Sequence, residues 1–182
     1  MKKTLWTFGD SFTQSFSDST DLWVKVYCDW KGYIPKVYGE ILADTLQFNL
    51  MNYGRGGIDN YSIFQNVCNI SDKILPNDII IIGWTSAIRF RLVDKWGEWK
   101  PIIPKFDRNA RNLEDVSNNT LEEILINRTK LKYTDEVHSW IKLLNIAFPN
   151  NLVIHWSPLD RGVGKNYIEN LTKIYNESTI SA

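Results

Sequence analysis

Three short segments of the sequence combine small, hydroxyl-bearing and amide residues at points where buried strands are expected to end. They are Gly9-Asp10-Ser11, the segment from Asn52 to Gly57, and Gly83-Trp84-Thr85-Ser86. Ligands of parallel sheets bind beyond the carboxyl ends of the strands, so we expect the three segments to meet on one rim. A serine hydroxyl at such a rim, surrounded by backbone N–H groups, can attack an acyl carbon and stabilise the resulting oxyanion. The pattern therefore predicts nucleophilic chemistry at Ser11.

Each segment is expected to supply a different group. Ser11 is the predicted nucleophile, and its N–H, the N–H of Gly57 and the hydroxyl of Thr85 form the predicted oxyanion hole, where losing one donor costs roughly 3 kcal/mol of transition-state stabilisation. Asp10 is expected to brace the turn by accepting from backbone N–H groups. The alternative for Ser11 is an ordinary serine that caps a turn, and for Gly57 a glycine required only by the loop. The residues expected to contact a substrate are Asp10, Asn52, Trp84, Ser86 and Arg89.

Strands and helices alternate along the chain and predict an α/β domain with helices on both faces of a parallel sheet, a three-layer α/β/α sandwich. The expected strands are Thr4 to Phe8, Phe48 to Tyr53, Ile79 to Ile82 and Leu152 to Trp156. The expected helices run from Pro35 to about Leu46, from a cap at Asp59 or Asn60 to about Ile74, from about Leu121 to Ala147 and from about Asn166 to Tyr175. Segments 14–33 and 90–118 are expected to be irregular insertions in a single domain that spans residues 1–182.

Composition argues against several classes of function. Lys and Arg number 21, Asp and Glu also number 21, and no basic block resembles a nucleic-acid-binding surface. The two cysteines, Cys28 and Cys68, form neither a disulfide framework nor a metal-binding pair, so no metal or other cofactor is expected. The N-terminus lacks the apolar stretch of a secretory signal, and the run Ile79 to Ile82 is too short to span a bilayer. We therefore expect a cytoplasmic protein without membrane contact, with a virion as the alternative location.

The three segments resemble the first three blocks of the SGNH (GDSL-type) hydrolase superfamily. The stretch from Thr7 to Thr13 resembles the Gly-Asp-Ser block, Asn52-x-Gly54-x-x-Gly57 resembles the second block, and Ile81 to Ser86 occupies the place of the third. The resemblance covers roughly the first half of the chain. It implies a flavodoxin-like sheet and a serine esterase that acts through an acyl-Ser11 intermediate without a cofactor. It also implies a small ester, a lipid or an acetylated polysaccharide as substrate, and tryptophans near the rim favour carbohydrate.

Two departures from this family stand out. Thr85 replaces the asparagine of the third block, and the sequence around it, followed by Arg89, resembles SGNH-like proteins of bacteriophages. The only match to the family's Asp-x-x-His pair is Asp135 with His138, which precedes the fourth strand and is expected on a solvated helix face; His155 is expected to pack within that strand. One explanation is that the chain stops short of the catalytic pair and of the last strand and helix. The other is that a partner protein completes the site and covers the edge of the fourth strand.

Two other functions are compatible with these patterns. The first is a non-catalytic SGNH-like binding or structural module, for instance a virion component, which the altered third block and the displaced histidine favour. The second is a nucleotide or phosphate binder that uses the loop from Gly54 to Gly57. That loop lacks a P-loop lysine and the Gly-x-Gly-x-x-Gly register, so the second is the weaker alternative.

Overall fold

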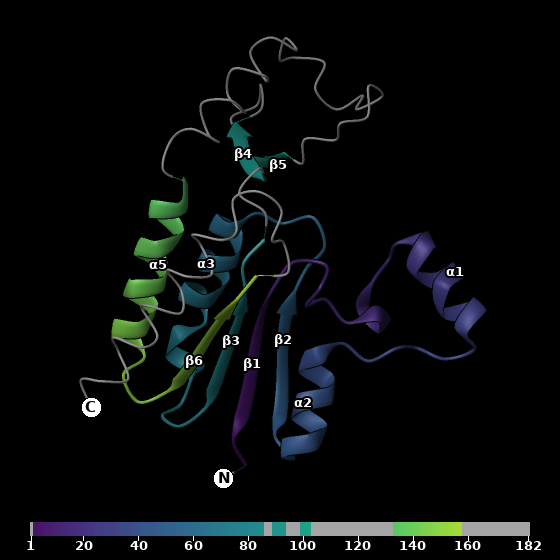
Figure 1. The fold of residues 1–182 in the computed structure, drawn as a ribbon, viewed down its shortest axis with the longest axis horizontal. Coiled ribbons are helices and arrows are strands. Elements are labelled where there is room, and N and C mark those ends of the chain that lie inside the picture. Colours follow the sequence, from purple (N-terminus) through teal and green to yellow (C-terminus); the bar gives the residue numbers. More distant parts are fainter. Residues whose placement is uncertain (1, 86–88, 94–98, 103–132, 158–182) are drawn as a thin grey trace.

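A parallel β-sheet forms the centre of the computed structural model, which describes residues 2–85, 89–93, 99–102 and 133–157 (Figure 1). Its strands are β1 (Thr4–Gly9), β2 (Asn49–Gly54), β3 (Ile79–Gly83) and β6 (Leu152–Trp156). They lie in the order β2-β1-β3-β6, and every neighbouring pair is parallel. The expected α/β class is confirmed, and the carboxyl ends of these strands share one edge of the sheet.

The register of the strands aligns their carboxyl ends closely. Phe8 of β1 lies opposite Tyr53 of β2 and Ile82 of β3, and Ile82 lies opposite His155 of β6. Successive side chains of a strand point to opposite faces of the sheet. Where helices cover both faces, the central strands β1 and β3 need apolar residues on both. The run Ile79 to Ile82 meets this need and explains why β3 is central.

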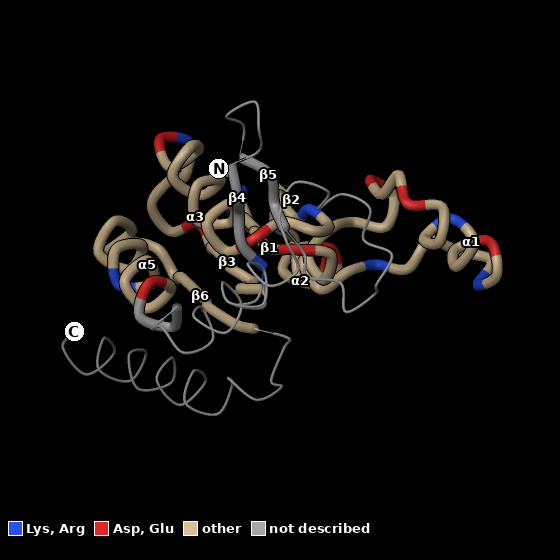
Figure 2. The backbone as a smooth tube through the Cα atoms, turned by 90° about the horizontal axis from the view of Figure 1, so that it is seen from above, with Lys and Arg blue, Asp and Glu red and all other residues tan. Residues whose placement is uncertain are grey.

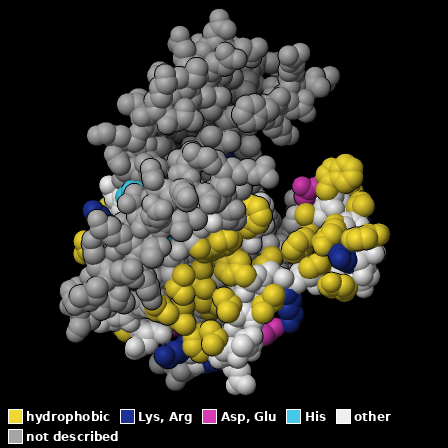
Figure 3. Space-filling model, in the orientation of Figure 1, with side chains coloured by type: hydrophobic (Ala, Val, Ile, Leu, Met, Phe, Trp, Pro, Cys, Tyr) yellow, Lys and Arg dark blue, Asp and Glu magenta, His cyan; other side chains and the backbone are white. Residues whose placement is uncertain are grey.

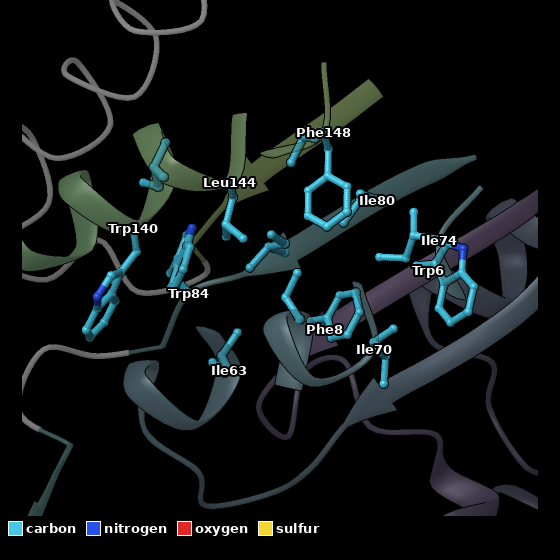
Figure 4. Packing of buried hydrophobic residues seen from close by; sticks show 14 of the residues in the cluster. Trp6, Phe8, Ile63, Ile70, Ile74, Ile80, Trp84, Trp140, Leu144 and Phe148 are labelled. Carbon is cyan, nitrogen blue, oxygen red and sulfur yellow. The ribbon is translucent and has the colours of Figure 1, made fainter. Parts of the chain in front are cut away.

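Helices cover both faces of the sheet and make three layers. On one face α2 (Tyr38–Leu46) packs through Ala43 against Leu5 and Ile81. On the other face lie α3 (Asn60–Asn69) and α5 (Tyr133–Ala147), which enclose the larger hydrophobic core (Figure 4). Its buried residues include Trp6, Phe8, Ile63, Val67, Ile80, Ile82, Trp84, Trp140, Ile141, Leu144 and Phe148.

The two insertions contain more regular structure than the sequence suggested. Segment 14–33, expected to be irregular, holds a short 3-10 turn, η1 (Phe16–Asp18), and the helix α1 (Leu22–Lys31). Segment 90–118, also expected to be irregular, begins with an antiparallel pair, β4 (Phe90–Val93) and β5 (Trp99–Ile102). In the part of the chain that the structure describes, no helix has both the length and the apolar character needed to cross a bilayer.

Helix boundaries differ from the expected ones in a few places. The second helix was expected to start at Pro35, but α2 starts at Tyr38, because Val37 is extended and its N–H donates to the Glu40 carboxylate at 2.8 Å. Of the two candidate caps of α3, Asp59 is the one used, and a 3-10 turn, η2 (Ser71–Lys73), follows the helix. The expected helix over 121–147 is described from Tyr133 onwards; residues 121–132 and the expected helix over 166–175 lie outside the described residues.

The amino end of the sheet is held by one buried carboxylate. Asp78, 4% exposed, accepts hydrogen bonds from the backbone N–H of Thr4 at 2.9 Å, the indole N–H of Trp6 at 2.9 Å and the N–H of Leu75 at 3.1 Å. The amide of Asn151 donates to the carbonyl oxygens of Leu75 and Asp78. These bonds tie the starts of β1, β3 and β6 together at the end opposite the predicted site.

Replacing this carboxylate should destabilise the whole sheet. Asp78→Ala should lower the free energy of unfolding by about 3 kcal/mol, because the buried Trp6 N–H and two backbone N–H groups lose their acceptor. Urea denaturation at neutral pH measures the change. The matched control is Asp72→Ala, at an exposed acidic residue of η2, which should change stability by less than about 0.5 kcal/mol. Equal effects of the two substitutions would contradict this role.

Candidate functional site

Ser11 lies at the outer bend of a tight turn that follows β1. The carbonyl oxygen of Asp10 accepts from the N–H groups of Thr13 and Gln14, both at 3.0 Å, and the Asp10 carboxylate accepts from the N–H of Phe12 at 3.1 Å. The predicted bracing role of Asp10 is thus seen in the structure. Ser11 itself is exposed, and its hydroxyl has no hydrogen-bond partner among the described residues. The turn therefore presents this hydroxyl to the outside.

The loop after β2 is bonded directly to the Ser11 turn. The N–H of Arg55 donates to the carbonyl of Gly9 at 3.0 Å, and the Asn52 amide donates to the carbonyl of Thr13 at 2.8 Å. The other end of the Asn52 amide accepts from the N–H of Gly54 at 2.8 Å. Both ends of the Asn52 side chain are thus occupied within the protein, so this residue positions the loop.

The segment after β3 is joined to the same turn by a buried cluster. The Asp10 carboxylate, 2% exposed, accepts from the hydroxyl of Thr85 at 2.6 Å and from the guanidinium of Arg89 at 2.9 Å. Asn60, at the start of α3, forms reciprocal bonds with the backbone N–H and carbonyl of Thr85 at 2.7 and 2.9 Å. All three predicted segments therefore meet at one edge of the sheet.

A cleft of about 600 Å³ lies beside the Ser11 turn and the loop after β2. Ser11, Arg55, Gly56 and Gly57 line one side, and residues of segment 14–24 line the other. Gly57 adopts a φ of 79°, in the left-handed region that glycine occupies without strain. No described residue accepts a hydrogen bond from the N–H of Gly57 or of Ser11. Both residues line the cleft.

Several residues expected to face a substrate are engaged inside the protein instead. The Thr85 hydroxyl donates to Asp10, so its proton is directed away from a third oxyanion position. Arg89 is paired with Asp10, and its guanidinium also donates to the carbonyl of Ile58 at 3.4 Å. Ser86 lies outside the described residues. Of the predicted oxyanion donors, only the N–H groups of Ser11 and Gly57 therefore have no acceptor among the described residues.

Trp84, expected on the rim as a substrate contact, belongs to the core. It is fully buried, and its ring stacks on Trp140 at 6.3 Å and on His155 at 5.9 Å between centroids. The reason is the alternation of β3, which sends Ile80, Ile82 and then Trp84 onto the face that α3 and α5 cover. The prediction that Trp84 lies on the rim is therefore wrong.

Neither histidine of the chain lines the cleft. His138 lies in α5, as the sequence suggested, and Asp135 lies in the first turn of that helix with a side chain outside the described set. His155 projects from β6 into the core, where its Nδ1 accepts from the Trp84 indole at 3.2 Å. Its Nε2 must then carry the proton, which it donates to the Asn145 amide oxygen at 3.2 Å. Burial lowers the pKa of His155 to about 4, so this imidazole is a neutral structural group.

The buried imidazole should make the protein sensitive to acid. Well above pH 6.5 His155 is neutral in both the folded and the unfolded state, so its protonation costs no stability. As the pH falls from 6.5 to about 4, the unfolded chain binds a proton that the folded chain does not, so up to about 3 kcal/mol of stability is lost. Urea unfolding across this range should show a shallower pH dependence for His155→Gln than for the wild type. Identical dependences would mean that His155 does not titrate in this way.

The close approach of the Ser11 turn to the β2 loop requires glycine at one position. A Cβ added to Gly54 would lie 2.3 Å from the backbone N of Gln14 and from the backbone carbon of Thr13. A Cβ on Gly56 would meet only the end of the Gln14 side chain, at 2.9 Å, which can move. A side chain is therefore tolerated much less well at position 54 than at position 56.

This difference gives a direct test of the contact between turn and loop. Gly54→Ala should lower the free energy of unfolding by about 3 kcal/mol or more, because two backbone segments must separate. Gly56→Ala, the matched control, should cost about 1 kcal/mol or less, since only a side chain has to shift. Thermal or urea unfolding of both variants measures the difference. If both variants lose the same stability, the turn and the loop are not packed as described.

Part of the cleft lining and the hydrogen bonds of Asn60 were not predicted from the sequence. Segment 14–33 was expected to be an irregular insertion, yet Phe16, Asp21 and neighbouring residues of it line the cleft. Asn60 was one of two candidate caps of α3, and only its pairing with Thr85 reveals a bridging role. Within the ranges that the structure describes, no group of three or more His, Cys, Asp or Glu residues is arranged to hold a metal ion.

Comparisons with protein-family models, with curated proteins and with solved structures found no match for this chain. The function is therefore inferred from the geometry of the cleft and from the motifs that form it.

Proposed function

We propose that this protein is a serine ester hydrolase of the SGNH type, in which Ser11 carries the acyl intermediate. The observation that supports it most is the exposed Ser11 hydroxyl in a cleft that Gly57 also lines, with the N–H groups of both residues lacking partners among the described residues. The strand order β2-β1-β3-β6 agrees with the order of flavodoxin-like sheets, whose ligands bind at this edge.

The proposed reaction has two steps at Ser11. The hydroxyl oxygen attacks the ester carbon while a base takes its proton, and the N–H groups of Ser11 and Gly57 donate to the oxyanion. Collapse of this intermediate breaks the bond to the alcohol, which leaves with the proton and gives an acyl-Ser11 ester. Water then attacks the acyl carbon, the base accepts its proton, and release of the acid restores the hydroxyl.

The described residues that line the cleft include no imidazole to act as this base. Both histidines of the sequence are described, and neither lines the cleft. Asp10 is also unsuited to the role, because its carboxylate is buried and already accepts from Thr85 and Arg89. An imidazole from another part of the protein or from a partner chain would complete the site.

The lining of the cleft favours a polar alcohol component of the ester. Ser19, Thr20, Asp21 and Arg55 line it together with Ser11, so hydroxyl, carboxylate and guanidinium groups surround a space of about 600 Å³. Such groups suit an acetylated carbohydrate, whose hydroxyls need several hydrogen-bond partners. This support is independent of the rim tryptophans, since Trp84 is buried.

Covalent labelling tests the proposal with the chain as it exists. A fluorophosphonate probe, with imidazole added to replace the missing base, should label the protein at Ser11, as read by mass spectrometry of peptides. Ser11→Ala should lose the label, and Ser17→Ala, at another exposed serine of the same segment, should keep it. Hydrolysis of p-nitrophenyl acetate above the Ser11→Ala background should follow the same pattern. Labelling that survives Ser11→Ala, or no labelling with imidazole present, would contradict the nucleophilic role.

The absence of an imidazole from the cleft also favours a second candidate, a non-catalytic binding module. In that case the cleft would bind a polar ligand such as an acetylated sugar without turning it over. A sugar that raises the melting temperature of the wild type and of Ser11→Ala equally, with no labelling of Ser11, would support this second candidate over the first.

A further inference from the structure

Helix α1 projects from the body and exposes most of its apolar side chains. Both Figure 1 and Figure 2 show it standing clear of the sheet. The helix is sharply bounded: the Asp21 carboxylate caps its start by accepting from the N–H of Trp23 at 2.9 Å, and Gly32 ends it at a φ of 72°. No residue of α1 is buried, and Trp23 and Trp30 are 78% and 73% exposed.

The exposed apolar residues of α1 form one continuous face. Leu22, Val26 and Trp30 follow each other at four-residue intervals, and Trp23 and Tyr27 lie beside them, so the five occupy a single side of the helix. Figure 3 shows hydrophobic side chains gathered over this helix. We call these five residues the α1 face. In an ordinary surface helix the apolar side faces the core, whereas here it faces outward.

A helix of this length needs a covering partner. Isolated helices shorter than about 12–15 residues are marginal in water, and packing of the apolar side supplies most of the stability of helices in proteins. α1 has 10 residues. Single chains rarely expose apolar patches beyond about 300–600 Å², and larger ones usually mark binding surfaces. The α1 face is therefore the strongest candidate for an interface in the described structure.

We propose that a second copy of this chain covers the α1 face, with the two α1 helices antiparallel about a two-fold axis at Val26. Antiparallel packing brings Leu22 of each copy opposite Trp30 of the other and the two Val26 side chains together, so apolar residues meet at the centre of the contact and on both sides of it. It also brings Asp21, at the amino end, opposite Lys31, at the carboxyl end, and pairs opposite ends of the helix dipoles. The surface is thus complementary to itself, as a two-fold interface requires.

Charge and area both favour a second copy over a membrane. The helix and its cap carry two acidic residues, Asp21 and Asp29, and two basic residues, Lys25 and Lys31 (Figure 2), so nothing attracts it to anionic lipid. With about 200 Å² for a fully exposed aromatic side chain, the α1 face and the neighbouring Tyr33 and Ile34 offer on the order of 700 Å². Specific interfaces bury about 600–1,000 Å² per partner, so the available area lies within the range of a specific dimer.

Pairing through α1 would also fix the outer wall of the Ser11 cleft. Val24, on the opposite side of the helix, lines the cleft together with Asp21 and Phe16, and the ring of Phe16 lies 5.9 Å from that of Tyr27. A partner that holds the α1 face therefore also holds the segment that closes the cleft. The pairing itself does not depend on the proposed function.

Sedimentation velocity over a wide range of protein concentration tests the pairing. The wild-type chain should show a reversible monomer–dimer equilibrium, and Trp23→Ser with Trp30→Ser should weaken dimerisation about tenfold or more. The matched control is Leu143→Ser with Ile146→Ser, which removes exposed apolar residues from α5 (55% and 75% exposed) and should leave the equilibrium unchanged. A monomer at all concentrations, or equal weakening by the control, would overturn the proposal.

Cross-linking tests the geometry with the aromatic residues intact. In a Cys28→Ser, Cys68→Ser background, Val26→Cys should form an intermolecular disulfide on oxidation, because two copies of position 26 face each other at the axis. Lys25→Cys, which is rotated by about 100° around the helix from Val26, should form much less of it. Equal cross-linking at both positions would overturn the antiparallel arrangement. Binding of a monomeric wild-type chain to phosphatidylcholine vesicles, lost in the Trp23→Ser, Trp30→Ser variant, would overturn it in favour of a lipid surface.

Discussion

The buried carboxylate of Asp10 connects the strand ends that make the candidate site. One oxygen accepts from the Ser11 turn through the N–H of Phe12, and the other accepts from Thr85 and Arg89, which follow β3. A buried charge is costly without partners, so the carboxylate and these donors require one another. The position of the Ser11 hydroxyl at the sheet edge depends on this cluster, because the turn that presents it is anchored to β3 through Asp10. The loop after β2 is then held by backbone bonds to the same turn.

This arrangement divides the polar residues of the rim into two groups. The side chains of Asp10, Asn52 and Thr85 form hydrogen bonds with other protein groups and thereby fix the positions of the strand ends. Ser11 and the N–H of Gly57 have no such partners among the described residues, and they border the cleft. The insertion after the turn supplies the opposite wall and carries α1 outward. The cleft is therefore lined by loops at the sheet edge and by a segment whose helix, α1, buries none of its residues.

Much of the fold follows from local patterns. The apolar run Ile79 to Ile82 indicated a central strand, and Asp59 indicated the start of α3, because both signals depend on neighbouring residues alone. α1 was missed, although Asp21 and Gly32 are suitable caps, because its apolar face did not fit the expectation that such residues lie in a core. Trp84 was misplaced for a similar reason: the exact length of β3 decides whether a residue follows the strand on its buried face or at the rim.

The sequence by itself determined the alternation of strands and helices, the three motifs at strand ends and the candidacy of Ser11 and Gly57. These features are encoded in residue type and spacing along the chain. Only the tertiary structure decided which polar groups bond to one another: Thr85 and Arg89 both donate to the Asp10 carboxylate. It also decided that neither histidine lines the cleft. The physical reason is that hydrogen-bond partners here are separated by as many as 79 residues, as in Asp10 and Arg89. Spacing along the chain carries no information about such pairs until the sheet brings the strand ends together.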